Sequence, residues 1–499
     1  MLSDADLDRL QERLLAAGYT VDAVLERLGE SGRRGLDRNS TTPARDALGA
    51  TDDPQATLVR LWILQDAVDA AAVTRALGEA SETLFNKGLL ARDGEDVRAT
   101  AVIRPYGVDA VTTSETATTT HAWICHDPLP NLDGRSDPPT PDHVLGVSPA
   151  STTLAQMTIR RPVATALDLG TGCGVQSLHL ARHAGRVVAT DLNPRALALA
   201  NITLGLSRTD ADLRLGSLYD PVAADTFDLI VSNPPFVISP PSTGRLTYRE
   251  GDLPGDELVR RVVTEGAARL TPQGTLQVLC NWAIVDGEPW DERLATWIRP
   301  TGCDALVLQR ETLDPHEYVE LWLADAGLDA APDHPARYRD WLDYLAAHRI
   351  TGIGLGWINL RNAGRATPDL RLEDWPFDVH QPIGDALAEQ QHAVDLAARD
   401  DASLLATRWR THPGIKQETI GRPGAEDPEH IVLRQTTGLG RATEADTAVA
   451  ALVGACDGDL AASEIIAALA TLLDVDADAL QAELTPRLRQ LIADGYLID

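Results

Sequence analysis

Basic residues, and lysine above all, are scarce in this sequence. The 499 residues include 74 aspartates and glutamates against 44 lysines and arginines, a formal net charge of −30, and the only lysines are Lys87 and Lys416. Such a surface repels a phosphate backbone on average, so nucleic-acid binding requires a local arginine patch. The sequence shows no dense patch, only pairs such as Arg33-Arg34, Arg160-Arg161 and Arg260-Arg261. The charge therefore argues against nucleic acid as a general partner.

Cysteine pairs and long apolar runs are also missing. The five cysteines are scattered and form no C-x-x-C pair. This argues against a disulfide framework or a zinc site, and we expect no metal. No apolar run is long enough to span a bilayer, and residues 1–6 lack the features of a signal peptide. We therefore expect a cytoplasmic protein with no membrane partner. The length and the 44% apolar content predict about three domains with sizeable cores.

What the sequence does contain is a glycine-rich turn between a strand and a helix. Residues 163–169 alternate small and branched apolar side chains, which predicts a buried parallel strand, and a helix is expected over 175–184. The turn is Asp168-Leu169-Gly170-Thr171-Gly172-Cys173-Gly174. Gly170 and Gly172 can adopt positive φ and let a ligand approach the backbone, and the helix N-terminus beyond them presents free N–H groups.

The second predicted strand, 186–190, ends at an acid, Asp191. An acid at this place binds ribose hydroxyls in βαβ nucleotide folds. The G-x-G-x-G spacing differs from the G-x-G-x-x-G dinucleotide fingerprint, and the leading Asp168 would repel a pyrophosphate but suits a cationic amino-acid group. The segment is therefore predicted to hold a nucleotide-like cofactor that carries positive charge. A purely structural strand-to-helix turn is the alternative.

A second motif follows another predicted strand. Residues 227–232 deliver Asn233-Pro234-Pro235-Phe236 to the carboxyl end of the strand, where open α/β sheets bind ligands. The prolines remove N–H donors and leave acceptor carbonyls beside the Asn233 side-chain oxygen. Such a loop can accept both hydrogens of a planar NH2 group and turn its lone pair toward an incoming methyl group, with Phe236 stacked on the acceptor. The alternative is a simple chain stop with Phe236 in the core.

Together these motifs resemble the class I S-adenosylmethionine-dependent methyltransferases, whose first motif is D/E-x-G-x-G-x-G, and among them the branch with an N-P-P-Y/F motif. That branch methylates planar nitrogens: glutamine amides in release factors, and exocyclic amines in RNA or DNA. The resemblance covers roughly the middle half of the chain. It implies S-adenosylmethionine as cofactor and an α/β fold, with a Rossmann-like, seven-stranded methyltransferase sheet and an antiparallel edge strand, expected at 350–360.

The resemblance also implies roles for individual residues. The methionine part of the cofactor would lie on the glycine turn, its ribose at the second strand and its adenine after a third strand, 212–215. The family usually has Asp at the position of Ser217, and a serine accepts a hydrogen bond more weakly than a carboxylate. Ser151-Thr152 would cap a helix and bond the cofactor carboxylate. The expected cofactor-binding residues are Asp168, Gly170, Thr171, Gly172, Gly174, Asp191, Leu192, Ser217, Leu218, Asn233 and Thr152, and the expected catalytic residues are Asn233, Pro234, Pro235 and Phe236.

The acceptor is indicated by weaker signals. The loop 238–256 resembles the loop after N-P-P-Y in the release-factor enzymes, which makes Arg245, Tyr248 and Arg249 candidate substrate contacts. The segment before the first strand keeps only the threonine of the glutamine-specific P-R-P-x-T pattern. On the loop and the acidic composition we expect a protein glutamine or asparagine amide as acceptor. The first alternative is an RNA or DNA amine, guanine N2 or adenine N6, and the second is a non-catalytic regulatory protein that binds the cofactor.

The remaining sequence predicts smaller modules. Residues 53–107 read as three helices and two short strands, the order of a winged helix, and a similar order recurs at 447–498. Because acids far outnumber arginines after residue 440, the last module is expected to contact protein or to scaffold the catalytic domain. The expected domains are a winged-helix-like domain over 1–110, a methyltransferase domain over 111–365 with a helical insertion at 315–348, a linker and helical extension over 366–435, and an acidic winged-helix-like domain over 436–499.

Overall fold

The computed structural model describes residues 2–108, 121–130, 132–134, 139–241, 253–328, 331–375, 377–422 and 429–499. The chain divides into two compact units. The first is Met1–Ala155 with Arg161–Trp375, and the second is Gln156–Arg160 with Pro376–Asp499. None of the helices in the described ranges is both long and apolar enough to cross a bilayer.

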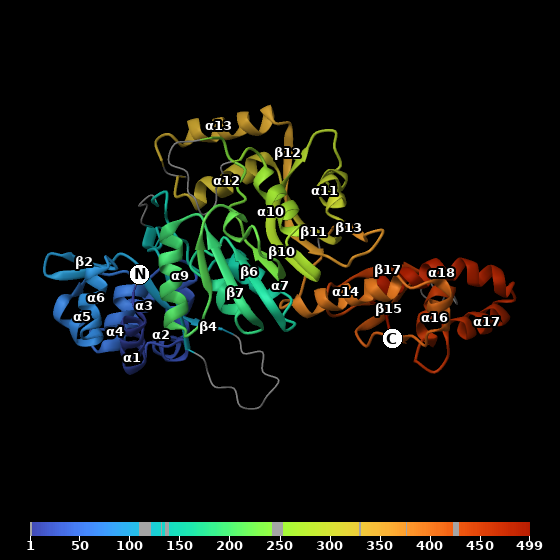
Figure 1. The fold of residues 1–499 in the computed structure, drawn as a ribbon, viewed down its shortest axis with the longest axis horizontal. Coiled ribbons are helices and arrows are strands. Elements are labelled where there is room, and N and C mark those ends of the chain that lie inside the picture. Colours follow the sequence, from blue (N-terminus) through green and yellow to red (C-terminus); the bar gives the residue numbers. More distant parts are fainter. Residues whose placement is uncertain are drawn as a thin grey trace. The chain divides into compact units, whose positions relative to one another are not determined.

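An eight-stranded mixed sheet forms the centre of the first unit (Figure 1). Its strands lie in the order β13-β11-β12-β10-β9-β6-β7-β8. The five strands from β8 to β10 are parallel, and β12 is antiparallel to both of its neighbours. The α/β class and the antiparallel strand agree with the sequence prediction. The strands are β6 Val163–Leu169, β7 Ala184–Asp191, β8 Asp212–Leu215, β9 Phe227–Ser232, β10 Leu270–Val285, β11 Asp304–Leu313, β12 Ile350–Arg361 and β13 Leu370–Asp374.

The antiparallel strand is not the edge strand that the sequence predicted. The strand expected at 350–360 is β12, which lies between β10 and β11. The edge is β13, paired in parallel with β11. The sheet therefore has eight strands instead of seven, and it extends beyond the residue 365 limit expected for the catalytic domain. No residue of β13 is fully buried, so this strand lacks the apolar run that identifies the inner strands.

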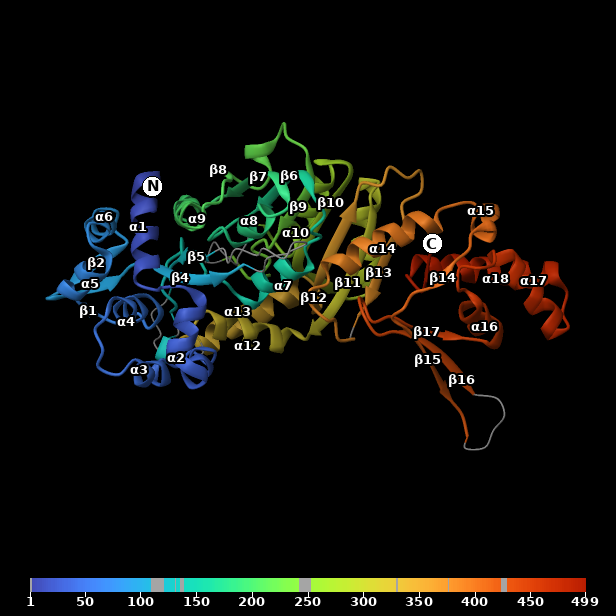
Figure 2. The same cartoon turned by 90° about the horizontal axis from the view of Figure 1, so that it is seen from below.

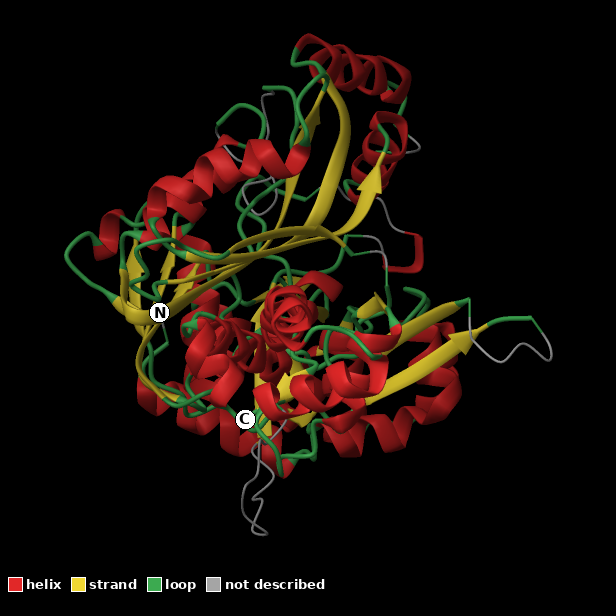
Figure 3. Ribbon diagram, turned by 90° about the vertical axis from the view of Figure 1, so that its right-hand side faces the viewer, coloured by secondary structure: helices red, strands yellow, loops and turns green. Residues whose placement is uncertain are grey.

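Figure 3 shows helices, in red, lying beside the strands, in yellow, and several helices of the first unit share apolar cores with its strands. α10 and α11 share an apolar core with β6, β9 and β10, while α8 and α9 join the core of the N-terminal module. The order of the sheet reverses between β6 and β9, which creates a crevice at the carboxyl ends of these strands. The helices are α7 Pro149–Met157, α8 Val175–Leu180, α9 Pro194–Leu206, α10 Glu257–Ala267, α11 Trp290–Ile298, α12 Pro315–Asp325 and α13 His334–Ala347, with short 3-10 turns η2 Leu132–Gly134, η3 Asp220–Val222 and η4 Arg299–Thr301.

The N-terminal module belongs to the same unit and packs on α9. Its helix α1 lies beside α9 (Figure 2), and Gln11 of α1 donates a hydrogen bond to the Leu206 carbonyl at 2.6 Å. Its three-stranded sheet has the order β1-β3-β2. The elements are α1 Asp4–Ala16, α2 Val21–Leu36, α3 Thr42–Leu48, α4 Pro54–Leu58, the π-helix η1 Val59–Ile63, β1 Val68–Asp69, α5 Ala70–Leu77, α6 Ala80–Asn86, β2 Leu90–Asp93, β3 Asp96–Ala99, β4 Val102–Gly107 and β5 His121–His126.

A two-stranded ribbon, β4 with β5, connects this module to the catalytic sheet and crosses the boundary expected at residue 110. β5 lies against α9. The amides of Trp123 and Cys125 donate to the hydroxyls of Ser207 at 3.2 Å and Thr203 at 2.8 Å. Hydroxyls at the C-terminal end of α9 thus satisfy backbone donors that an edge strand would otherwise expose.

The second unit contains two helices within residues 366–435, where the sequence predicts a helical extension, and a hairpin. The hairpin is β15 with β16, extended by β17. The last strand, β18, pairs with β14. The elements are α14 Gly384–Ala397, α15 Asp401–Ala406, β14 Arg410–Thr411, β15 Ile415–Ile420, β16 His430–Gln435, β17 Ala442–Ala445, α16 Thr447–Ala455, α17 Ala462–Leu473, α18 Ala477–Ala493 and β18 Leu497–Ile498.

Candidate functional site

A cavity of about 360 Å³ lies at the carboxyl ends of β6, β7 and β9. This is the crevice where open α/β sheets hold their ligands. The two sequence motifs meet there, because Ser232 at the end of β9 pairs with Leu169 at the end of β6 and its hydroxyl donates to the Leu169 carbonyl at 2.9 Å. The expected site residues that line the cavity are Gly170, Thr171, Gly172, Asp191, Leu192, Ser217, Leu218, Asn233, Pro234 and Pro235.

Other expected residues lie elsewhere. Gly174 packs against α9, where a Cβ would lie 3.2 Å from that of Ala200. Thr152 does not line the cavity, whereas its neighbour Ser151 does. Phe236 is partly buried and also does not line it. The predicted substrate contacts Arg245, Tyr248 and Arg249 lie outside the described residues.

The glycine turn has the backbone that the sequence predicts. Gly170 and Gly172 have φ values of +75° and +54°. A Cβ built on either would meet no other atom within 4 Å, so both glycines face open space. Side chains at these positions would be strained by the positive φ and would occupy the cavity. The turn therefore lets a ligand approach the backbone.

Asp168 braces this turn from beneath and does not line the cavity. Its side chain is 1% exposed and accepts hydrogen bonds from the hydroxyls of Thr171 at 2.6 Å and Ser177 at 2.7 Å. Burial raises the pKa of Asp168 to about 6, because the charged form is poorly solvated there. Its observed contacts are with the turn and the following helix.

Asp191 does face the cavity, and its carboxylate also holds the turn in place. One oxygen accepts from the Gly172 N–H at 2.9 Å and the other from the Asn193 N–H at 2.8 Å. Burial raises the pKa of Asp191. A carboxylate has about four acceptor positions. Positions therefore remain for the hydroxyls of a ligand.

Asn233 lines the cavity and carries a hydrogen-bond acceptor that no described residue uses. Its Oδ1 atom is buried and has no hydrogen-bond partner among the described residues. Pro234 and Pro235 follow it and supply no backbone N–H. A buried acceptor without a donor costs about 1–3 kcal/mol. The site is thus arranged to receive a hydrogen-bond donor from a ligand.

Polar residues that the sequence did not single out for this site also line the cavity, among them His143, Gln176, Asn193 and Arg261. Asn193 has a local signal, because it precedes a proline and caps α9. The other three come from a loop and from two helices and carry no recognisable motif. Only the folded sheet brings them to the cavity.

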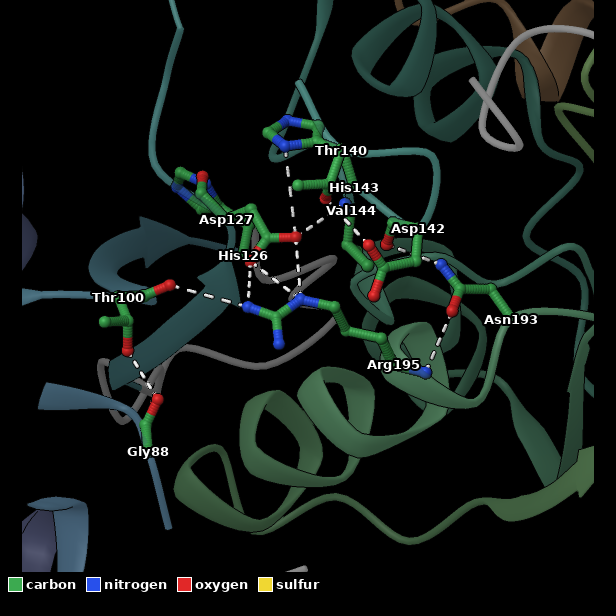
Figure 4. A network of polar contacts seen from close by, with 10 residues as sticks. All are labelled: Gly88, Thr100, His126, Asp127, Thr140, Asp142, His143, Val144, Asn193 and Arg195. Atoms are coloured by element: carbon green, nitrogen blue, oxygen red, sulfur yellow. Dashed lines mark hydrogen bonds and ion pairs between the residues drawn. The ribbon is translucent and has the colours of Figure 1, made fainter. Parts of the chain in front are cut away.

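A buried polar network holds one wall of the cavity in place (Figure 4). Asp127, which follows β5, is 4% exposed, and the Nε atom of Arg195 in α9 lies 3.0 and 2.9 Å from its two oxygens. The same carboxylate accepts from the Val144 N–H at 2.8 Å. Asn193 donates to the Asp142 carbonyl, also at 2.8 Å. Residues 142–144 are therefore tied to both α9 and β5.

The described residues also bear on nucleophilic catalysis by a cysteine and on metal binding. Cys173 lines the cavity, but burial raises its pKa to about 12, so it is a neutral thiol near pH 7 and a poor nucleophile. Within the described ranges, no group of three or more His, Cys, Asp or Glu side chains is placed to hold a metal ion.

Three parts of the chain match known families. Residues 146–286 match the methyltransferase small domain, and this range contains both motifs. Residues 16–100 match a domain of unknown function (DUF7059), and residues 391–499 match another (DUF7782).

Curated relatives match the same central region. Ribosomal RNA small subunit methyltransferase C of Idiomarina loihiensis is 32% identical over 146 residues, 29% of this chain and 39% of the relative. Release factor glutamine methyltransferase of Deinococcus radiodurans is 39% identical over 123 residues, which cover 22% of this chain and 43% of that relative. Ribosomal protein uL3 glutamine methyltransferase of Bradyrhizobium diazoefficiens is 32% identical over 178 residues, which cover 33% of this chain and 51% of that relative.

The chain thus spans about half or less of the length of these relatives. Enzymes with the matched domain use S-adenosylmethionine as methyl donor and belong to the EC 2.1.1 class. Residues 146–286 therefore form a methyltransferase small domain, the kind of domain that uses S-adenosylmethionine, and this region is similar to parts of the release-factor glutamine methyltransferases and of ribosomal RNA small subunit methyltransferase C.

Proposed function

We propose that the protein transfers the methyl group of S-adenosylmethionine to the side-chain nitrogen of a protein glutamine or asparagine. The observation that carries this proposal is that Asn233 lines the cavity and that its buried Oδ1 atom has no hydrogen-bond partner among the described residues. An amide NH2 group supplies the donor that this oxygen lacks.

The residues around the cavity fit the cofactor. S-adenosylmethionine supplies an electrophilic methyl group on a positively charged sulfur. The open backbone at Gly170 and Gly172 would receive its methionine part, and the free acceptor positions of Asp191 its ribose hydroxyls. Ser217 and Leu218, on the wall after β8, would contact adenine.

In this proposal the acceptor nitrogen is positioned by the second motif. The Asn233 side chain and the Pro234 carbonyl accept its two hydrogens, which turns the nitrogen lone pair toward the cofactor. Phe236, which lies beside the cavity and not on its wall, would stack on the part of the planar group that extends past Pro235. The nitrogen loses one proton to solvent on methylation. Positioning and charge placement supply the rate enhancement, so the site needs no strong general base.

Two observations favour a protein acceptor over RNA. Two of the three relatives described above are named as glutamine methyltransferases, and the chain carries a formal charge of −30, which opposes a phosphate backbone. The likeness to ribosomal RNA small subunit methyltransferase C supports the second candidate, methylation of an RNA amine. The same loop would hold either nitrogen.

The terminal modules are proposed to be winged-helix-like scaffolds or protein-contact domains. Helix, strand, two helices and two strands follow one another from α4 to β3, with the sheet order β1-β3-β2, which supports this interpretation for the N-terminal module. For the acidic C-terminal module the support is its three helices followed by a strand.

The acceptor can be found by labelling. A lysate of cells that lack the protein is incubated with purified protein and cofactor that carries a radiolabelled methyl group. We expect label that protease removes and that complete enzymatic digestion, which leaves side-chain amides intact, yields as N-methylglutamine or N-methylasparagine. Label removed by nuclease would overturn the protein acceptor in favour of RNA or DNA. Cofactor binding without any transfer would favour the regulatory alternative.

A further inference from the structure

The α12–α13 hairpin is an insertion that the sheet itself does not require. It joins β11 to β12, which are antiparallel neighbours. A two-residue turn is enough to connect such strands. Here residues 314–349 are inserted, and α12 and α13 pack on β12, as Figure 1 shows in gold. The insertion therefore calls for an explanation beyond connectivity.

The hairpin packs on the residues that follow the Asn-Pro-Pro-Phe motif. Val237 and Ile238 are 5% and 1% exposed, and they share an apolar cluster with residues of both helices. The Phe236 ring contacts the Trp322 ring of α12 edge to face, with centroids 6.1 Å apart and an interplanar angle of 71°. The position of the Phe236 ring is thus fixed from the hairpin side.

A tyrosine hydroxyl anchors the backbone just beyond the motif. Tyr318 of α12 is fully buried, and its hydroxyl accepts from the Ile238 N–H at 2.8 Å and from the Asn281 side-chain amide at 2.9 Å. Asn281 lies on β10, the neighbour of β9. The hydroxyl therefore joins the end of the acceptor motif to the hairpin and to the sheet.

A second tyrosine hydroxyl anchors the chain before α10. Tyr344 of α13 accepts from the Gly255 N–H at 3.0 Å. The next residue, Asp256, is held by two 2.7 Å contacts with Arg293 and accepts from the Ala283 N–H at 2.8 Å. One tyrosine on each helix of the hairpin thus holds a backbone amide, one shortly after the motif and one shortly before α10.

We propose that the α12–α13 hairpin positions the methyl acceptor. Tyr318 would be a positioning residue that acts through the backbone just after the acceptor motif, Tyr344 one that acts through the backbone before α10, and Trp322 would set the ring of Phe236. This inference rests on the proposed function, because it assigns the hairpin to the acceptor of that reaction. The described residues that line the cavity include none from 314–349. Among the described residues, the hairpin contacts Phe236 and Ile238 beside the acceptor motif and not the glycine turn, so substitutions in it are expected to act on the acceptor and to leave cofactor binding unchanged.

The hydroxyls are tested by Tyr318→Phe and Tyr344→Phe, which keep both rings. Tyr318→Phe removes the hydrogen bond to the Ile238 N–H and loosens the end of the motif, and Tyr344→Phe removes the hydrogen bond to the Gly255 N–H and loosens the chain before α10. For each variant kcat/KM for the methyl-accepting substrate is expected to fall about tenfold or more, while the Kd for S-adenosylmethionine stays within about twofold. Tyr338→Phe is the matched control. Its hydroxyl, on the same hairpin, bonds Glu320 and His316 at the surface, and its kinetics are expected to remain those of the wild type.

Trp322 is tested by two substitutions of different severity. Trp322→Ala removes the wall beside Phe236 and is expected to raise KM for the acceptor. Trp322→Phe keeps an aromatic ring there and is expected to restore most of the affinity. An equal loss in both variants, or a loss of cofactor binding in either, would contradict the role given to this ring.

Hydrogen exchange supplies a readout that does not depend on activity. Amide exchange in the peptide that contains Ile238 is expected to be faster in Tyr318→Phe than in Tyr338→Phe. If the wild type transfers no methyl group, the proposed function fails, and exchange still reports whether Tyr318 holds the motif. If the wild type is active and both tyrosine variants keep its acceptor kinetics, the inference about the hairpin is wrong.

Discussion

Asp168 opens the glycine motif, and its side chain points away from the cavity that the motif forms. The hydroxyls of Thr171 and Ser177 satisfy its carboxylate beneath the turn. The same geometry fixes the turn on which the cofactor is proposed to lie. A buried carboxylate of this kind makes the stability of the folded protein depend on pH.

We predict a specific pH dependence from Asp168. Its folded pKa of about 6 is higher than the ordinary value of 3.8. The folded state therefore binds the proton more tightly, and this stabilisation is fully present below about pH 4 and is lost as the pH rises through 6. Asp168→Asn stays neutral and should lack this decline.

Denaturant unfolding from pH 4 to pH 7 measures the difference. The free energy of unfolding of the wild type should fall, relative to that of Asp168→Asn, by about 1.4 kcal/mol for each unit of raised pKa. If the free energies of unfolding of the two proteins change with pH in parallel, the pKa of the Asp168 carboxyl is not raised by folding and the prediction is wrong.

At the scale of residues, sequence predicted the backbone better than the side chains. The positive φ of Gly170 and Gly172 follows from the strand-to-helix turn. The turn lies next to Asn233 because the two motifs follow the carboxyl ends of neighbouring parallel strands, β6 and β9. Asp168 and Thr152 were expected at the ligand and do not line the cavity. Which way a side chain points depends on neighbours that the motif does not contain.

At the scale of elements, the wall of residues 142–144 shows what sequence cannot reveal. The Val144 N–H bonds Asp127, which follows β5, and Asp127 in turn bonds Arg195 in α9. Asp127 and Arg195 are far apart in the chain. The contact exists only because the β4–β5 ribbon packs on α9. The same limit applies to β13, whose place at the edge is set by β11. In contrast, the inner strands β6, β7, β9 and β12 were predicted, because burial on both faces requires apolar runs.

We predict that Arg195→Met weakens cofactor binding. The variant leaves the Asp127 carboxylate buried without the Arg195 guanidinium, so the wall loses one of its two ties to α9 and keeps only the hydrogen bond from Asn193 to the Asp142 carbonyl. The Kd for S-adenosylmethionine, measured by titration calorimetry, is expected to rise about tenfold, a change of about 1.4 kcal/mol.

Arg208→Met is the control for this variant. Arg208 follows the other end of α9, is largely exposed and bonds Gln11. Its Kd for the cofactor should equal that of the wild type. Equal values for Arg195→Met and Arg208→Met would show that the wall holds its shape without the buried ion pair.

At the scale of the whole molecule, the net charge separates the two candidate acceptors. With 74 acids against 44 basic residues, we predict that the protein does not bind a ribosomal RNA fragment in a filter assay, even at low salt. Tight binding that weakens steeply as salt is added would contradict this and favour the RNA amine. A matched double-stranded DNA serves as the comparison for sequence-independent binding.

The central claim is that Asn233 holds the acceptor nitrogen beside a cofactor bound on the glycine turn. It is tested most directly by Asn233→Ala, with the Kd for S-adenosylmethionine and the rate of methyl transfer measured on the same preparation. The account predicts a Kd within about threefold of the wild type and a rate lower by about a hundredfold or more. A variant that binds the cofactor and transfers methyl at the rate of the wild type would contradict it.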